Sequence, residues 1–222
     1  LIGGAMISLL IYLVKFIGPD FWIWFGLVAA AFILLVNMFY TSIILPLFNK
    51  LTPLPEGELK TAIETFAKKV NFPLDNVFVM DGSKRSAKAN AFFSGIGKKK
   101  KIVLYDTLIN NHTKEELVAV LAHEVGHFKK KHIVWSYLIS ITQVFFVLFV
   151  LSKMIFNENL SIALGGSQQA IHLNLIAFGI LFSPISGITG LLMSMLSRKN
   201  EFEADAFAKE TFDGNALSNA LK

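Results

Sequence analysis

The sequence contains no cysteine and has few charged residues. Only 17% of its 222 residues are Asp, Glu, Lys or Arg, whereas an average soluble domain has about 25%. The absence of cysteine excludes disulfides, thiolate metal ligands and a cysteine nucleophile. Hydrophobic residues make up 54% of the chain. This composition excludes a disordered, collagen-like or coiled-coil chain, and it argues against a wholly soluble domain.

Long apolar stretches indicate a membrane protein. A helix needs about 20 mostly apolar residues to cross a bilayer, and four stretches approach or exceed that length, namely 1–17, 21–49, 133–152 and 171–196. The sequence therefore predicts a mainly α, polytopic α-helical membrane protein, with two transmembrane helices in residues 1–45 and two in residues 133–197. Because the chain opens with an apolar run at Leu1 and stops within a helical pattern, we expect it to be a piece of a longer protein.

The basic residues are unevenly distributed and predict the orientation. Residues 46–132 hold fifteen Lys and Arg, and residues 198–222 hold four more, whereas the rest of the chain has only Lys15 and Lys153. The positive-inside rule therefore places residues 46–132 and the tail at 198–222 on the cytoplasmic side. This explains the net charge of +5 without a nucleic-acid partner, and we expect none.

Residues 46–132 carry patterns of both helix and strand. Apolar residues in 56–70 recur at helical spacing, which predicts a helix. Three short runs rich in β-branched and aromatic residues, at 76–80, 91–94 and 101–105, predict strands of a small sheet. We therefore expect a small cytoplasmic α+β region attached to the membrane helices.

A capped helix carries the chemistry. Thr113 and Glu116 have the spacing of a capping box, which predicts a helix starting there and running through His132. Within it, HEVGH places His123 and His127 four residues apart on one face, where two neutral imidazoles suit Zn²⁺. Glu124 can flank the ion and accept a proton from an activated water. Two histidines and a glutamate on an otherwise apolar helix would be costly to bury without such partners.

A third protein ligand is needed, and residues 201–205 (EFEAD) offer the best candidates. They follow the last predicted span, where a continuing helix could reach the histidine helix. Glu201 and Asp205 share a face, so that Glu201 can be the third ligand and Asp205 can accept a hydrogen bond from a ligand histidine. Glu203 remains an alternative ligand, because spacing alone favours Glu201 only modestly. We expect one Zn²⁺ per chain, and we expect His132 to lie at the membrane interface.

Several segments together resemble a known family. The matching text includes PLFNKLTPLPEGELKTAIETFAKKVNFPL, KRSAKANAFF, EELVAVLAHEVGHFKKKH and SRKNEFEADAFA. The chain resembles the integral-membrane CAAX prenyl endopeptidases, or type I CAAX proteases, which are zinc metalloproteases of the gluzincin kind. The family fold is a helical barrel around an intramembrane chamber with a zinc site on its cytoplasmic side.

The resemblance implies roles for individual residues. It implies His123, His127 and Glu201 as zinc ligands, Glu124 as the catalytic base and Asp205 as a supporting residue of the catalytic set. Asn90, Ala91 and Phe92 then resemble the strand edge that binds substrate by backbone pairing, although an ordinary sheet strand is the alternative.

The sequence thus predicts a zinc-dependent membrane endopeptidase. Its expected partners are the lipid bilayer and a peptide or protein substrate, with a prenylated C-terminal CAAX tail as the candidate that the resemblance suggests. One alternative is a quality-control zinc protease acting on membrane proteins. Another, from a different class, is a catalytically inactive membrane scaffold or an ion-binding transporter. The family has about seven spans, and its oxyanion-stabilising His and Arg would lie beyond Lys222.

Overall fold

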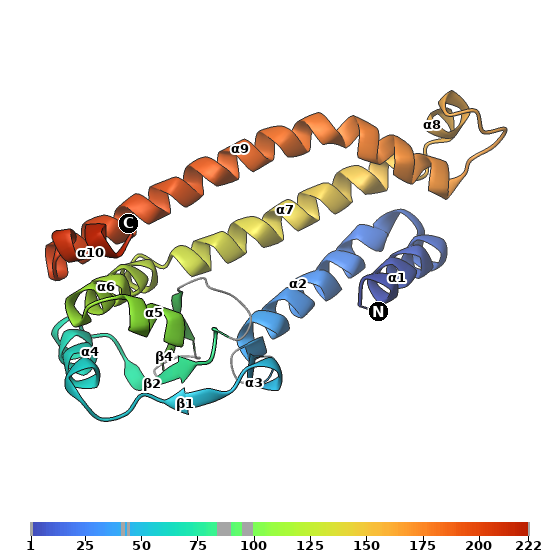
Figure 1. Ribbon diagram of the computed structural model, residues 1–222. Helices are drawn as coiled ribbons and strands as arrows, with labels where there is room; N and C mark the ends of the chain where they lie inside the picture. Colours follow the sequence, from blue (N-terminus) through green and yellow to red (C-terminus); the bar gives the residue numbers. More distant parts are fainter. Residues whose placement is uncertain (1, 41–42, 44, 84–89, 95–99, 222) are drawn as a thin grey trace. The chain divides into compact units, whose positions relative to one another are not determined.

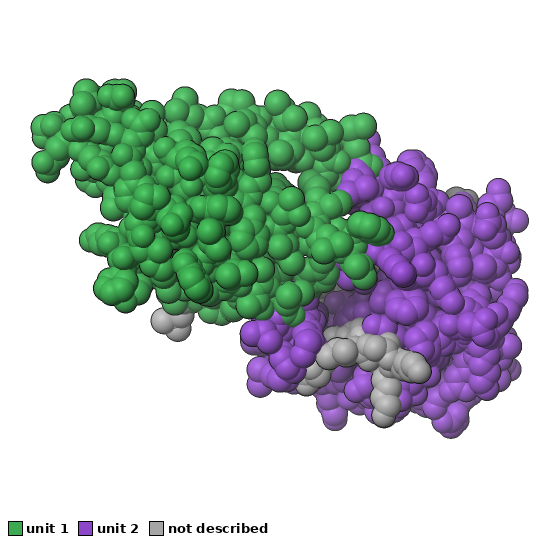
Figure 2. Space-filling view, turned by 180° about the vertical axis from the view of Figure 1, so that it is seen from behind, with its two compact units in different colours: residues 1–34, 134–195 green, residues 35–133, 196–222 purple. Residues whose placement is uncertain are grey.

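The chain folds into two compact units, described here by a computed structural model of residues 2–40, 43, 45–83, 90–94 and 100–221. The helical unit contains residues 1–34 and 134–195, and the mixed unit contains residues 35–133 and 196–222 (Figure 2). Several long helices run from one unit into the other, so each unit takes two separate stretches of sequence.

The helical unit is built from apolar helices (Figure 1). Its elements are α1 (Ile2–Ile17), the 3₁₀ turn η1 (Gly18–Asp20), α2 (Phe21–Phe39), α7 (His132–Met154), α8 (Glu158–Ala163) and α9 (Ile171–Thr211). In the described part of the chain, three helical segments are long and apolar enough to cross a membrane: Ile2–Phe39, His132–Met154 and Ile171–Thr211. The first is interrupted by η1, and α1 alone is only 16 residues long. The number of spans therefore stays a prediction.

Close packing holds the helical unit together. A Cβ atom at Gly26 would lie 2.6 Å from the ring of Phe145, so α2 can approach α7 only because residue 26 has no side chain. Toward the C-terminal end of α7, a buried apolar cluster includes Val14, Phe21 and Leu151. Because each residue comes from a different helix, this cluster fixes α1, α2 and α7 together.

The mixed unit contains a four-stranded sheet. The strands are β1 (Leu51–Pro53), β2 (Leu74–Met80), β3 (Ala91–Ser94) and β4 (Lys100–Tyr105), in the order β1-β2-β4-β3. β2 and β4 pair in parallel, whereas the outer strands β1 and β3 pair antiparallel with their neighbours. β3 is therefore an edge strand among the described residues.

Helices cover one face of this sheet. They are α4 (Glu58–Lys69), α6 (Lys114–Lys129) and α10 (Gly214–Ala220), with the short helices α3 (Leu45–Phe48) and α5 (Asp106–Asn111) nearby in the chain. Ile102 and Leu104 of β4 pack with Leu121 of α6 in the main core. Val103, between them, packs on the other face with Leu45. This alternation is the period-two pattern of a strand buried on both faces.

The predicted local elements are present, with one correction. The expected helix at 56–70 is α4, the strand at 91–94 is β3, and the strands at 76–80 and 101–105 are β2 and β4 with small extensions. The helix expected from Thr113 through His132 starts at the predicted cap, but its predicted end is wrong, because α6 ends at Lys129 and α7 begins at His132. Lys131 between them has φ 57°, a left-handed conformation that no α-helix can contain.

Candidate metal centre

The helix α6 presents two histidines from a well-anchored frame. Thr113 accepts a hydrogen bond from the amide of Glu116, and the Glu116 side chain accepts one from the amide of Thr113, which completes the predicted capping box. The apolar face of α6 is buried in the core of the mixed unit. This anchoring fixes the rotation of the helix, so that His123 and His127 emerge together on the opposite side.

A close helix crossing brings α9 to the histidines. A Cβ atom at Gly126 would lie 3.0 Å from the Cα of Ala204 and 3.2 Å from the Cβ of Phe207. The glycine in HEVGH therefore lets the backbones of α6 and α9 touch. Small residues allow this kind of close approach between helices. As a result, Glu201, which follows the apolar part of α9, lies beside the two rings.

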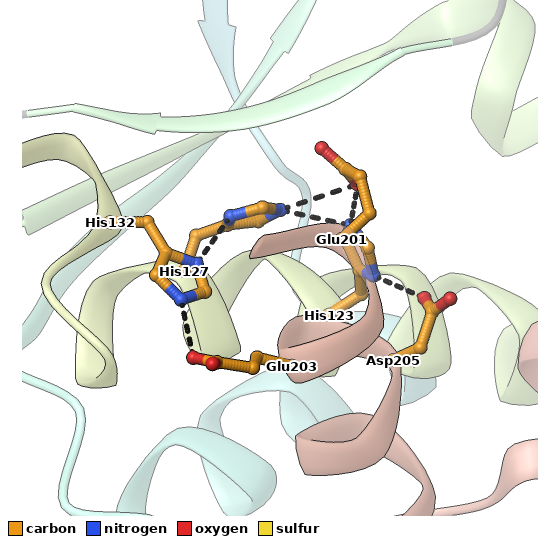
Figure 3. A network of polar contacts seen from close by, with 6 residues as sticks. All are labelled: His123, His127, His132, Glu201, Glu203 and Asp205. Carbon is orange, nitrogen blue, oxygen red and sulfur yellow. Dashed lines mark hydrogen bonds and ion pairs between the residues drawn. The ribbon is translucent and has the colours of Figure 1, made fainter. Parts of the chain in front are cut away.

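Three donor atoms converge at this crossing (Figure 3). The Nε2 atoms of His123 and His127 are 3.1 Å apart. The Oε2 atom of Glu201 lies 3.2 Å from the first and 3.6 Å from the second. Among the described residues, His123, His127 and Glu201 form a group that could hold a metal ion. The spacing left Glu201 and Glu203 as alternatives for the third donor. The Glu201 carboxylate lies near both rings, whereas that of Glu203 contacts His132.

Asp205 fixes the ring of His123. Its Oδ1 atom lies 2.8 Å from Nδ1 of His123. A carboxylate can only accept, so the Nδ1–H of His123 donates, and in the neutral ring Nε2 then presents a lone pair to the converging group. This is the arrangement in which a carboxylate orients a metal-binding histidine. Asp205 lies on α9 one helical turn from Glu201.

His132 lies beside His127. It is 5% exposed, and its Nδ1 is 3.0 Å from Nδ1 of His127, while its Nε2 is 3.1 Å from Oε2 of Glu203. The expectation that His132 lies at the membrane interface, apart from the site, overlooked this contact. On a continuous helix, residues five apart differ by about 140° in direction. The break between α6 and α7, with its left-handed residue Lys131, brings the two rings together, and the KKK run gave no signal of it.

The chemistry of the converging atoms fits a cation. Nε2 of His123 is an acceptor, because its Nδ1–H donates to Asp205. The Glu201 oxygen 3.2 Å away is also an acceptor. Two acceptors at this distance repel unless a proton or a cation lies between them. Burial lowers the pKa of His127, and the nearby His123 lowers it further. Neutral imidazoles are the form that binds metals, so the residues present fit a divalent metal ion.

Glu124 occupies a different environment from Glu201. The pKa of its carboxyl is raised to about 7, mainly by burial; the charge of His123 opposes this shift, and the negative charge of Glu201 adds to it. A carboxyl group with a pKa near 7 can exchange protons near neutral pH, which suits a general base or acid. Glu201, by contrast, is more than half exposed. The two glutamates therefore have environments suited to different roles.

The edge strand β3 packs against the histidine helix. The ring of Phe93 contacts that of Phe128, the residue after His127, with centroids 5.7 Å apart. The amide of Tyr105 in β4 donates to the carbonyl of Asn90. Ala91 is 4% exposed and belongs to the core. The expected substrate strand is thus fixed to α6 through its side chains, while one backbone edge is unpaired within the described strands.

Comparison with known families gives two matches. Residues 53–220 match the model of peptidase family M48. Residues 1–50 match the model described as the CAAX prenyl protease N-terminal segment, with five membrane helices. The first match covers the sheet, the histidine helix and the donor from α9. A metallopeptidase family and a membrane-helix family therefore account for nearly the whole chain.

Individual relatives agree with these matches. A CAAX prenyl protease 1 homolog from Dictyostelium discoideum is 41% identical, covering 94% of this chain and 50% of the relative. A homolog from Homo sapiens is 36% identical, covering 96% and 53%. A crystal structure of Ste24p from S. mikatae has a TM-score of 0.87 and 35% identity, covering 99% of this chain and 55% of that one. The chain spans about half the length of the curated relatives it matches.

Proposed function

The chain belongs to peptidase family M48, and we propose that it carries the zinc centre of a membrane endopeptidase. The observation that supports this best is the convergence of His123, His127 and Glu201 from two helices. The relatives are named CAAX prenyl proteases, and the solved Ste24p shares the fold over 99% of the chain. The fold, the metal-binding group and the family thus support the same reaction class, hydrolysis of a peptide bond.

Zinc is the proposed metal because of donor type and spacing. A tetrahedral zinc ion with ligands at 2.0–2.1 Å needs donor atoms about 3.3–3.4 Å apart. The three separations among the donor atoms are 3.1, 3.2 and 3.6 Å. Two imidazoles and one carboxylate are also a known ligand set of catalytic zinc, with the fourth position open. We therefore propose His123, His127 and Glu201 as its ligands.

Glu124 is the proposed general base. A zinc ion bound here would supply Lewis acidity that activates water and polarises the substrate carbonyl. Glu124 then accepts a proton from the attacking water and delivers it to the departing amine. Its raised pKa of about 7 suits both steps, although a cation beside it would favour the ionised form. Asp205 keeps the Nε2 lone pair of His123 directed at the metal throughout.

The backbone edge of β3 is the proposed substrate site. Because Asn90 and Tyr105 form a hydrogen-bonded pair, the alternation of an antiparallel ladder directs the backbone groups of Phe92 toward β4 and those of Ala91 and Phe93 outward. We propose that Ala91 and Phe93 pair with an extended substrate. The Asn90 side chain accepts from the amide of Ala91, so a substrate carbonyl must displace it to use that donor.

A prenylated substrate is supported by an apolar groove within the helical unit. The groove lies between α7 and α9, has a volume of about 470 Å³, and is lined largely by apolar side chains such as Trp135, Phe146 and Leu192. Each Å² of apolar prenyl surface that moves from water into the groove would stabilise the complex by about 25 cal/mol. We propose a CAAX-type C-terminal tail as the substrate class, because the relatives are named for it.

The proposed orientation follows the charge distribution. The basic residues of 46–132 and 198–222 all belong to the mixed unit, which also contains His123, His127 and Glu201. The positive-inside rule therefore supports a cytoplasmic location for the metal centre.

Metal analysis and peptide cleavage test this function together. The full-length protein, purified in detergent, should contain one zinc per chain and should cleave a farnesylated CAAX peptide, with loss of activity on chelation and recovery on adding zinc. Glu124→Gln should keep the zinc but lower kcat by roughly 10²–10⁴-fold, because only the proton transfer is lost. Glu201→Ala should lose the zinc. Glu210→Gln, an exposed carboxylate further along α9, is the matched control.

The outcomes distinguish the alternatives. Preference for an unfolded membrane protein over the farnesylated peptide would favour a quality-control protease. Zinc uptake without any cleavage would favour a scaffold or a transporter. Equal cleavage of farnesylated and unmodified peptides would reject the prenyl-binding role of the groove, while leaving the peptidase assignment intact.

A further inference from the structure

His132 and Glu203 form a chain of contacts that ends on His127. From Glu203, the contacts run from Oε2 to Nε2 of His132 (3.1 Å) and from Nδ1 of His132 to Nδ1 of His127 (3.0 Å) (Figure 3). His132 is almost fully buried. Neither residue contributes to the converging donor group, so the ligand set does not explain why they lie there.

The directions of these hydrogen bonds can be derived. The carboxylate of Glu203 can only accept, so Nε2 of His132 donates to it. In neutral His132 the Nδ1 atom is then an acceptor, and Nδ1 of His127 must donate to it. His127 in turn keeps its proton on Nδ1 and a lone pair on Nε2, the atom 3.6 Å from Glu201. Each step fixes the next, and the last atom is the one that would face the metal.

We infer that His132 and Glu203 position His127 for metal binding, as Asp205 does for His123. This inference rests on the proposed zinc centre. The two ligand histidines would then be held differently: His123 directly by a carboxylate, and His127 by a carboxylate acting through a second imidazole. Both carboxylates come from α9, two residues apart, so the helix that supplies the third ligand also orients the other two.

The neighbourhood of Glu203 is compatible with this role. Lys199, one turn earlier on α9, lies 3.8 Å from its Oε1 atom, which leaves Oε2 for His132. The side chain of Glu203 is 38% exposed, whereas that of His132 is 7% exposed. The buried imidazole thus connects a partly solvated carboxylate with the enclosed metal-binding group. A leucine at position 132 would keep the packing but would leave Nδ1–H of His127 without an acceptor.

Paired substitutions separate hydrogen bonding from packing. We expect His132→Leu and Glu203→Leu to lower zinc affinity by about 10- to 100-fold, the usual effect of losing such a partner. His132→Gln and Glu203→Gln keep an acceptor oxygen and should recover most of that loss. The controls are His172→Leu and Glu210→Leu, which remove an imidazole and a carboxylate elsewhere. Affinity is measured by competition with a chromophoric chelator on folded, detergent-solubilised protein.

A second readout is independent of turnover. Co²⁺ substituted for zinc should show altered visible absorption in His132→Leu, because the ligand ring is free to rotate, and a near-native spectrum in His132→Gln. In the zinc-saturated enzyme, kcat should fall while KM stays within roughly twofold, since neither residue belongs to the proposed substrate strand.

The results that would overturn the inference are distinct from failure of the proposed function. Leucine variants that bind zinc within twofold of the wild type would reject it, as would glutamine variants no better than the leucine ones. Wild-type protein that binds zinc but cleaves no peptide would reject the peptidase and leave this inference testable by affinity alone. Wild-type protein that takes up no zinc would reject the metal centre and this inference with it.

Discussion

A side chain at Gly126 would begin 3.0 Å from the Cα of Ala204. At this close approach, the helix that carries two histidines lies against the helix that carries Glu201. The spacing of the donor atoms therefore depends on a residue that bears no functional group. Because the obstructing atoms belong to the backbone of α9, no side-chain rotation can make room.

Substitution of Gly126 should weaken metal binding in proportion to side-chain size. Gly126→Ala must push α9 away by a few tenths of an ångström, and Gly126→Val by more, which separates Glu201 from the histidines. We expect a zinc affinity several-fold lower for alanine and at least about 100-fold lower for valine, measured by chelator competition. Gly57→Ala, where a Cβ would meet no atom within 4 Å, is the control. Unchanged affinity in Gly126→Val would contradict the crossing as the determinant of the site.

Asp205 should act through its acceptor oxygen. Asp205→Ala leaves Nδ1–H of His123 unpaired and should lower zinc affinity by about 10- to 100-fold. Asp205→Asn retains a carbonyl oxygen at the same position, and its affinity should fall less. Affinities from isothermal titration with zinc would check both. An asparagine variant as weak as the alanine variant would show that the negative charge, and not the hydrogen bond, is what matters.

Glu124 should make the stability of the metal-free protein depend on pH. Its pKa is raised from 4.5 to about 7 in the folded protein by burial. Below pH 4.5 the carboxyl is neutral in both states and costs nothing. Between pH 4.5 and 7 the unfolded chain releases the proton and the folded chain retains it. Stability is therefore lost as the pH rises, by an amount that approaches about 3 kcal/mol above pH 7.

The comparison with Glu124→Gln isolates this effect. The metal-free variant should melt at nearly the same temperature as the metal-free wild type at pH 4.5, and at a higher temperature at pH 8. Thermal unfolding of both proteins in chelator across this range checks the sign. A difference that is constant with pH would mean that the Glu124 carboxyl titrates normally. Zinc should reduce the difference, because a cation stabilises the ionised form.

Lys131 should tolerate glycine better than any branched residue. Its φ of 57° costs a non-glycine residue roughly 1 kcal/mol or more, and glycine is the preferred residue just after a helix end. Lys131→Gly should therefore leave the melting temperature unchanged or raise it, with zinc affinity intact. Lys131→Val should lower both, because the turn that brings His132 to His127 becomes strained. Circular dichroism melts and chelator competition on the two variants check both effects. A Lys131→Gly variant with a lower melting temperature or weaker zinc binding would show that the lysine side chain has a role of its own.

The local pattern of the sequence determined much of the site. Helical periodicity accounts for three of its features: the capping box at Thr113 and Glu116, the histidines four residues apart, and the face shared by Glu201 and Asp205. These features depend on residues within one helix, for which 3.6 residues per turn is a sufficient rule. The strands at 91–94 and 101–105 were similarly readable from β-branched and aromatic runs.

The tertiary structure decided the contacts between helices. Spacing could rank Glu201 above Glu203 but could not say which carboxylate meets the rings, since that depends on how α9 crosses α6 at Gly126. The position of His132 depended on a left-handed residue at Lys131, a conformation that the sequence KKK does not favour. Periodicity describes a helix by itself; the placement of one helix against another is set by the shapes of two surfaces, and those exist only once the chain has folded.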